Sequence, residues 1–400
     1  MKVKHFDKLQ HYYLDAIWGR LDEGKDVPAT LEAYAKYIDD TESDPEEFCA
    51  VLHRQLADYP AVDPDNGAWR TWGFVVPFPG GQPEEYLSNP LGEGTHQQML
   101  AINIPGTDAI VFCIEKRERA LPSASINDAL FERAQKMKER EERDLTRKDY
   151  AILKEEVTAQ LLKTAPVRRV RTYVMFTGRD EFVFTGSQKT AEETNAIIRR
   201  AFSSLPTTPA FTSEVLLQNL FKSILTNDDK TFDHGSYVKL RNEEKEVVTV
   251  KDGELDDERY TEMLERGFVP MELEFSHLTV DNLRIWLKMN HKGDVKALST
   301  QEEEDLYEDF HSQYEVGESG YQSKIAELWI LHRVLGHFTA AMRKASVVAD
   351  RTYDGETILT GDELDDQHQS RLADGEQDDE DVDDQDQDDT EEEDDDEWAI

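Results

Sequence analysis

The sequence predicts an α+β fold: an elongated body of antiparallel sheets and long charged helices, followed by a disordered acidic tail. Several segments repeat apolar residues at the helical spacing, and others alternate apolar and polar residues as half-buried strands do. A hairpin pattern at residues 171–185 and a meander pattern at residues 268–298 predict antiparallel pairing. The last 51 residues are dominated by acids, which predicts a chain end without a packed core.

The first 115 residues are expected to form helices and then strands. Residues 1–60 have the spacing of helices, and a helix is expected to begin at Pro45 and run to about Leu56. The helical spacing near the N-terminus is carried by Leu9, Tyr12, Tyr13, Ala16 and Ile17. Strands are expected at residues 69–77, 99–103 and 109–115.

A block of charged helices and a hairpin follows. A charged segment (116–119) leads into a helix that Ser123 or Ser125 caps and that continues to about Leu145. Thr146 and Asp149 predict the capping box of a second helix, which ends near Leu162. The remaining predictions of this block are strands at 171–176 and 181–185 and a helix that opens at the capping box Thr190–Glu193.

The last part of the body is expected to combine helices with the meander. Helices are predicted at 213–225, 255–267, 302–314 and 321–345, and strands at 247–251 and within 268–298, with a turn at 291–293. The expected regions are 1–68 (helical), 69–210 (basic helices and hairpin), 211–349 (a second α+β region) and 350–400 (the tail).

The negative charge of the chain is concentrated at its end. The formal net charge is -41, and residues 350–400 hold 25 acids against two bases. Residues 1–349 hold 61 acids and 43 bases, so the body has enough Lys and Arg to form local positive surfaces. Residues 374–397 hold 18 acids and no base, which predicts disorder, and an apolar tip with Trp398 and Ile400 follows them.

Cysteine usage and hydropathy predict a cytoplasmic protein. Cys49 and Cys113 are too few for a disulfide framework, which is typical of a reducing compartment. No apolar run in the sequence approaches the roughly 20 residues that span a bilayer. The N-terminal residues have no signal-peptide pattern.

Motifs of enzymes are mostly missing from the sequence. It has no Gly-rich phosphate loop, no helical His pair suited to zinc and no nucleophile elbow, so no catalytic residue, metal ligand or cofactor is predicted. One alternative stays open: Asp233 with Glu243 and Lys245 could imitate the carboxylates and lysine of a magnesium-dependent nuclease. In a chain with 86 acids, such a spacing is also expected by chance.

Positive charge predicts a polyanion-binding surface in one block. Residues 116–200 hold 19 bases and 14 acids, although a solvated helix with internal ion pairs would have the same composition. Bases on rigid elements without a recognition-helix motif favour contact with the DNA backbone over base readout. The sharpest cluster in the sequence comprises Arg147, Lys148, Lys163, Arg168, Arg169 and Arg171.

The order of short motifs over residues 69–210 resembles the bacterial recombination-associated RdgC family. The matching segments are 72–77, 110–114, 115–123, 153–157, 161–162, 189–193 and 204–206, with a weaker collinear match from 230 to 345 that includes 250–255. This resemblance implies a ring-shaped homodimer whose positively lined hole encircles duplex DNA without sequence preference and restrains recombinase activity. It also implies a nucleoid-associated location, and the family has been labelled an exonuclease without an established active site.

Two positions depart from the family's ring contacts. Where the family has an aromatic residue after Leu-Leu-Pro-Arg, this chain has Leu161–Pro166 without an aromatic, and where the family has Lys-Gln it has Lys251 and Asp252. With the resemblance included, the predicted phosphate contacts are Lys116, Arg147, Lys148, Arg168, Arg169, Arg171, Lys189 and Lys251.

The acidic tail is similar to the C-terminal tails of single-stranded-DNA-binding proteins. Such tails recruit replication and repair proteins, so Trp398 and Ile400 are expected to bind a partner. A tethered polyanion also competes with DNA because its effective concentration is high. Two alternatives stay open: a tail that only keeps the protein soluble, and a hub or DNA mimic whose body binds no DNA.

Overall fold

The computed structural model describes residues 6–14, 33–34, 37, 45–65, 67–78, 99–211, 213–251, 257–300, 303–314 and 320–345. The chain divides into two compact units, Met1–Ala349 and Asp350–Ile400, and every described residue belongs to the first. The acidic tail, including Trp398 and Ile400, therefore lies outside the described residues, as does Asp252. Within the described residues, no helix has the length and apolar character needed to cross a membrane.

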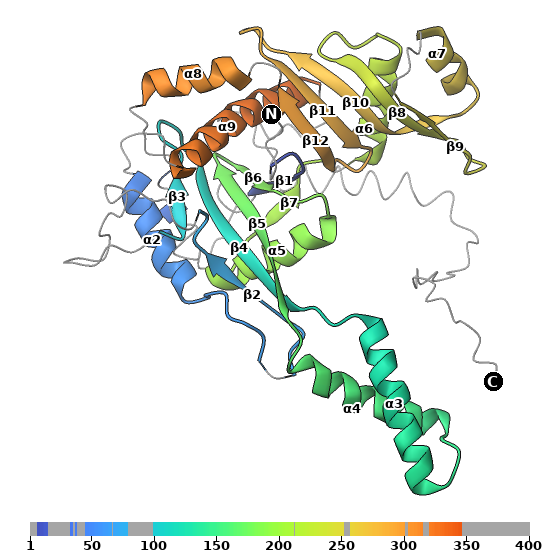
Figure 1. Ribbon diagram of the computed structural model, residues 1–400. Helices are drawn as coiled ribbons and strands as arrows, with labels where there is room; N and C mark the ends of the chain where they lie inside the picture. Colours follow the sequence, from blue (N-terminus) through green and yellow to red (C-terminus); the bar gives the residue numbers. More distant parts are fainter. Residues whose placement is uncertain are drawn as a thin grey trace, which may run out of the picture. The chain divides into compact units, whose positions relative to one another are not determined.

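Two antiparallel sheets and their helices confirm the predicted α+β class (Figure 1). The first sheet has the strand order β2-β4-β5-β6-β1-β7, with β3 paired to β4. Its strands are β1 (Gln10–Leu14), β2 (Arg70–Val75), β3 (Ala101–Asn103), β4 (Ile110–Arg119), β5 (Val167–Thr177), β6 (Asp180–Val183) and β7 (Thr207–Pro209). β4 and β5 pair from Ile110↔Phe176 to Arg119↔Val167, so the strand predicted at 109–115 continues through the charged segment.

Helices cover both faces of this sheet. On one face α2 (Pro45–Ala57) and α5 (Gln188–Phe202) pack near Phe176, whose ring lies 6.4 Å from that of Phe202. On the other face α9 (Gly320–Lys344) is fixed by Arg343, which donates hydrogen bonds to both carboxylate oxygens of Asp180 at 3.1 and 3.0 Å. A buried sheet centre of this kind requires apolar residues on both sides of its strands.

β1 is a strand that is buried on both faces and whose sequence has the spacing of a helix. A helix is predicted around residues 9–17, and this prediction is wrong for Gln10–Leu14, which form a strand between β6 and β7. All five residues are buried, because Tyr12 and Tyr13 point to opposite faces that are both covered. Without an exposed side the strand has no polar alternation, and its apolar residues imitate a helical spacing.

The second sheet has the order β12-β11-β10-β8-β9 and confirms the predicted meander. Its strands are β8 (Asp233–Arg241), β9 (Val247–Val250), β10 (Val269–Leu278), β11 (Arg284–Asn290) and β12 (Val295–Thr300). The other helices of this part are α6 (Glu214–Leu225), α7 (Asp257–Glu265) and α8 (Glu303–Gln313). α6 packs on β10 and β8, where the rings of Phe221 and Phe275 lie 6.0 Å apart.

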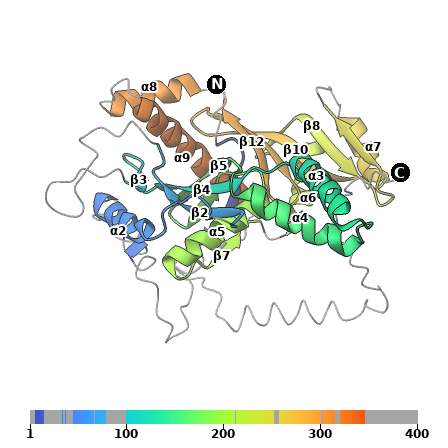
Figure 2. The same ribbon diagram turned by 60° about the horizontal axis from the view of Figure 1, so that its bottom comes forward.

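α3 (Ser123–Glu141) and α4 (Arg147–Leu162) form a helical hairpin that continues from the ends of β4 and β5 (Figures 1 and 2). The predicted capping box of α4 is confirmed: Thr146 accepts from the Asp149 backbone, and Asp149 accepts from the Thr146 backbone. The predicted serine cap of α3 is wrong, because Pro122 occupies the cap position and makes no side-chain cap bond. The cap of α5 is Ser187 and not Thr190.

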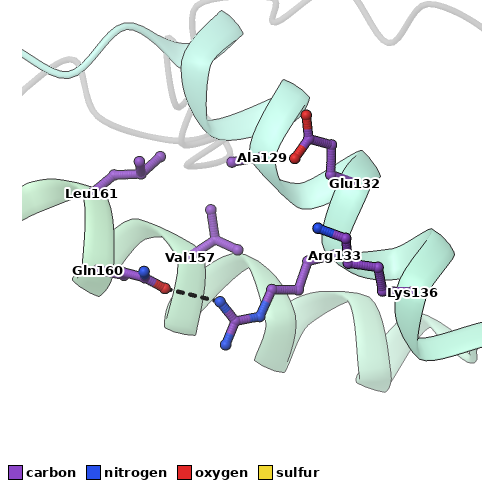
Figure 3. Close-up of a pocket in the computed structure, with 7 residues that line it drawn as sticks. All are labelled: Ala129, Glu132, Arg133, Lys136, Val157, Gln160 and Leu161. Atoms are coloured by element: carbon purple, nitrogen blue, oxygen red, sulfur yellow. Dashed lines mark hydrogen bonds between the residues drawn. The ribbon is translucent and has the colours of Figure 1, made fainter. Parts of the chain in front are cut away.

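The hairpin encloses a groove between its two helices (Figure 3). Arg133 of α3 donates a hydrogen bond of 2.8 Å to the side-chain oxygen of Gln160 on α4 across this groove. The groove is lined by Ala129, Glu132, Arg133, Lys136, Val157, Gln160 and Leu161. Its lining is therefore mixed: three of these side chains are apolar, three are charged and one is an amide.

Candidate nucleic-acid interface

The ends of β4 and β5 carry a local excess of positive charge. We name this region the basic ladder: Glu115–Arg119 of β4 and Val167–Arg171 of β5, which are paired residue by residue. It holds six bases and two acids. The helical hairpin, residues 123–163, holds nine bases and nine acids. The excess of positive charge in this block therefore lies on the strands, where polyanions are attracted most strongly.

Side chains of the ladder alternate between two faces, because directly opposed residues of an antiparallel pair share a face. Arg117 and Arg169 are opposed, and so are Glu115 and Arg171, which places these four side chains on the first face. The second face carries Lys116 opposite Val170 and Glu118 opposite Arg168.

Glu115 organises the first face. Its carboxylate accepts hydrogen bonds from Arg117 Nε at 2.8 Å and from Arg171 Nε at 3.0 Å, and its side chain is only 3% exposed. Burial alone would raise the pKa of Glu115, but the hydrogen bonds from Arg171 and Arg117 hold it below its usual range. A buried carboxylate that accepts from the Nε of both guanidinium groups fixes the orientation of the two arginine side chains.

The second face carries Lys116, Arg168 and a base that sequence analysis did not select. The Lys116 ammonium lies 3.4 Å from Glu118 and 5.0 Å from the centre of the Trp72 ring. Arg168 is exposed and forms no ion pair with a described residue. Arg70 of β2 is opposed to Glu118 and lies 3.4 Å from Glu193 of α5. The register between β2 and β4 brings Arg70 here, and the spacing of residues along the chain does not show which residues of two distant strands lie opposite each other.

Arg119 has a structural role. Its guanidinium donates to the backbone oxygens of Pro64 at 2.7 Å, Lys163 at 3.3 Å and Ala165 at 3.2 Å. It thereby joins β4 to the loop before β2 and to the segment between α4 and β5. That segment includes Ala165, which is buried and follows α4 where the resemblance implies an aromatic residue.

The structure brings four of the eight predicted contacts together: Lys116, Arg168, Arg169 and Arg171. Arg147 and Lys148 begin α4 at the far end of the hairpin, and a helix of 16 residues is about 24 Å long (Figure 1). The sequence suggests a cluster of Arg147 and Lys148 with Arg168 and Arg169. The structure does not form this cluster, because the two pairs lie at opposite ends of α4. Lys189 is exposed in the first turn of α5, and Lys251 is exposed directly after β9 of the second sheet.

The suggested nuclease arrangement is also not formed. Asp233 begins β8, whereas Glu243 follows its end at Arg241, and nine residues of strand span about 27 Å. Asp233 instead lies 3.1 Å from Arg284. Two carboxylates at opposite ends of a strand cannot bind one magnesium ion, so this pair is wrong as a metal site. Among the described residues, no group of three His, Cys, Asp or Glu side chains is arranged to bind a metal.

Comparison of the sequence with known proteins identifies a family. Residues 88–345 match the family model described as "Putative exonuclease, RdgC". The chain is 34% identical over 108 residues to the recombination-associated protein RdgC of Shewanella denitrificans, covering 26% of this chain and 36% of the relative. It is 32% identical over 123 residues to RdgC of Tolumonas auensis, covering 30% and 39%.

These alignments span about a third of the length of the curated relatives, whereas the family model covers more than half of this chain. The match includes β4, both helices of the hairpin, β5 and the whole second sheet. The chain belongs to the RdgC family.

Proposed function

We propose that this protein binds duplex DNA without sequence preference and modulates homologous recombination in the nucleoid as a ring-shaped homodimer. In this role it limits the access of recombinases or nucleases to the DNA. The supporting observation is the basic ladder, a local excess of four positive charges on a chain with a net charge of -41. The names of the relatives, recombination-associated proteins, support the cellular process.

The basic ladder is suited to contact with the phosphate backbone of DNA. Its bases stand on paired strands, and Arg168 and Arg169 are exposed at neighbouring positions on opposite faces. Phosphate contacts of this kind fix position on the duplex and carry no sequence information. In this proposal Lys116, Arg168, Arg169 and Arg171 form the main contact, while Lys189, Lys251, Arg147 and Lys148 add contacts from other elements.

Salt dependence tests the proposed function. Each neutralised phosphate contributes about -0.9 to the slope of log affinity against log salt, so the four main contacts predict a loss of roughly 150-fold between 50 and 200 mM salt. Gel shifts with two duplexes of equal length and unrelated sequence should give affinities within about threefold of each other. A binding curve that stays flat between these salt concentrations would show that phosphate contacts do not carry the binding.

We also propose that the acidic tail binds replication or recombination proteins through Trp398 and Ile400, and that it competes with DNA. Deleting residues 374–400 should leave duplex affinity unchanged or make it tighter, because 18 acids and no base are removed. The matched control keeps the acids and replaces only Trp398 and Ile400 by alanine, which should leave duplex affinity as in the full chain. Loss of DNA binding on deletion would instead support the hub or mimic alternative.

A further inference from the structure

Two arginines of the ladder share one carboxylate on the first face. Arg117 Nη1 lies 2.9 Å and Arg169 Nη2 lies 3.5 Å from the same oxygen, Oδ1 of Asp63. Arg117 and Arg169 are opposed residues of β4 and β5, so their guanidinium groups converge from neighbouring strands. Asp63 comes from a third segment, the loop between α2 and β2, and its side chain is 52% exposed.

The backbone around Asp63 is fixed, whereas among the described residues its side chain is held by these two arginines alone. Thr71 donates a hydrogen bond to the oxygen of Val62, and Arg119 donates one to the oxygen of Pro64 at 2.7 Å. Gly73 allows the loop to cross the strand, because a Cβ atom there would collide with the backbone of Pro60 and Ala61. A rotation of the Asp63 side chain into solvent therefore frees both guanidinium groups without moving the loop.

We propose that Arg117 and Arg169 form a binding site for one phosphate of the DNA backbone, and that the Asp63 carboxylate occupies this site in the absence of DNA. Arginine forks bind carboxylate and phosphate with the same geometry. Glu115 holds Arg117 through its Nε, which leaves Nη1 directed at the shared anion. Arg117 thus becomes a DNA contact that sequence analysis did not select.

Exchange of the carboxylate for a phosphate is feasible on energetic grounds. Asp63 is 52% exposed and Arg169 is 56% exposed, whereas Arg117 is 18% exposed, so the ion pair is largely open to solvent, and such pairs contribute little to stability. A phosphodiester that replaces Asp63 also releases condensed counterions, which the internal carboxylate does not. Asp63 therefore weakens DNA binding by competing for the site, and this inference rests on the proposed function.

The test replaces Asp63 by asparagine and uses Asp65 as the matched control. Asp65 lies in the same loop, is exposed and forms no ion pair with a described residue, so Asp65→Asn makes the same change in net charge. Gel shifts with a short duplex should show Asp63→Asn binding about five- to tenfold tighter at low salt, with a salt slope steeper by about one. Asp65→Asn should change the affinity by less than about twofold.

A second variant tests whether the gain in duplex affinity depends on the arginines. Adding Arg169→Gln to Asp63→Asn should remove the gain in affinity, while thermal unfolding shows whether all variants remain folded. Equal gains from Asp63→Asn and Asp65→Asn would overturn the inference in favour of a general charge effect, as would no gain from Asp63→Asn. If the unaltered protein binds no duplex, the proposed function is overturned, and this inference is overturned as well.

Discussion

Replacing Arg168 and Arg169 together by glutamine is expected to weaken duplex binding roughly 50-fold at about 0.1 M salt. Each lost phosphate contact also makes the slope of log affinity against log salt shallower by about 0.9, so the double variant should lose about two units of slope. The two side chains lie on opposite faces of the basic ladder, and glutamine keeps their length and polarity. A salt titration of the gel shift measures both quantities.

Arg147 and Lys148 provide the matched control, since replacing both by glutamine removes the same charge. They lie in the first turn of α4, at the end of the hairpin that is distant from the basic ladder. In the hairpin as a whole, nine acids offset nine bases. This variant is expected to lose less affinity than the Arg168 and Arg169 variant, because the acids of the hairpin offset part of the contribution of its bases. An equal loss from both double variants would extend the interface over the whole hairpin, and a loss from the control alone would place it at the hairpin tip.

Glu181→Gln is expected to stabilise the protein at pH 8 and to have little effect at pH 5. Glu181 is fully buried in β6, its Oε2 accepts a hydrogen bond of 3.4 Å from Asn195, and Oε1 has no hydrogen-bond partner among the described residues. Burial raises the pKa of Glu181 to about 8 despite the positive charge of Arg199. In the unfolded chain a glutamate has a pKa of about 4.3.

The sign of the pH effect follows from these two values. The folded state keeps the Glu181 proton up to about pH 8, whereas the unfolded state releases it above about pH 4.3. Glu181 therefore lowers the free energy of unfolding progressively as pH rises through this window, by up to about 5 kcal/mol. Glutamine has the same shape and no proton to lose, so it removes this dependence.

Thermal unfolding at pH 5 and pH 8 tests this expectation, with Glu192→Gln as control. Glu192 is exposed on α5 and accepts a hydrogen bond from Gln188 at 3.0 Å, so its replacement should act similarly at both pH values. If Glu181→Gln destabilised the protein more at pH 8 than at pH 5, the carboxylate would have to be ionised and well paired in the folded state.

The sequence predicted elements best where one side of the element meets solvent. In the meander, β11 alternates strictly between half-buried and buried residues, so its strand pattern is visible in the sequence. β1 could not be predicted, because both of its faces are covered and its partners lie more than 160 residues away. β8 was not predicted either, since its half-buried residues include His, Gly and Tyr beside the aliphatic ones.

The candidate interface was predicted in composition but not in geometry. Lys116 and Arg168 could be selected as bases of a positive block, yet their neighbour Arg70 depends on the register between β2 and β4. The contact of Arg117 and Arg169 with Asp63 joins three segments that are separated by 52 or more residues. Register and loop crossing are set by tertiary packing, which local spacing does not encode.

The position of β1 determines the order in which the chain can assemble during synthesis. β1 pairs with β6 and β7, so its backbone groups have no strand partners until Asp180–Val183 and Thr207–Pro209 have been made. Between Leu14 and Asp180 a ribosome needs roughly 8 to 30 s at ordinary elongation rates. The helical hairpin and its paired strands β4 and β5 can form from local contacts in that interval, and the N-terminus then inserts last into a sheet already built from later residues.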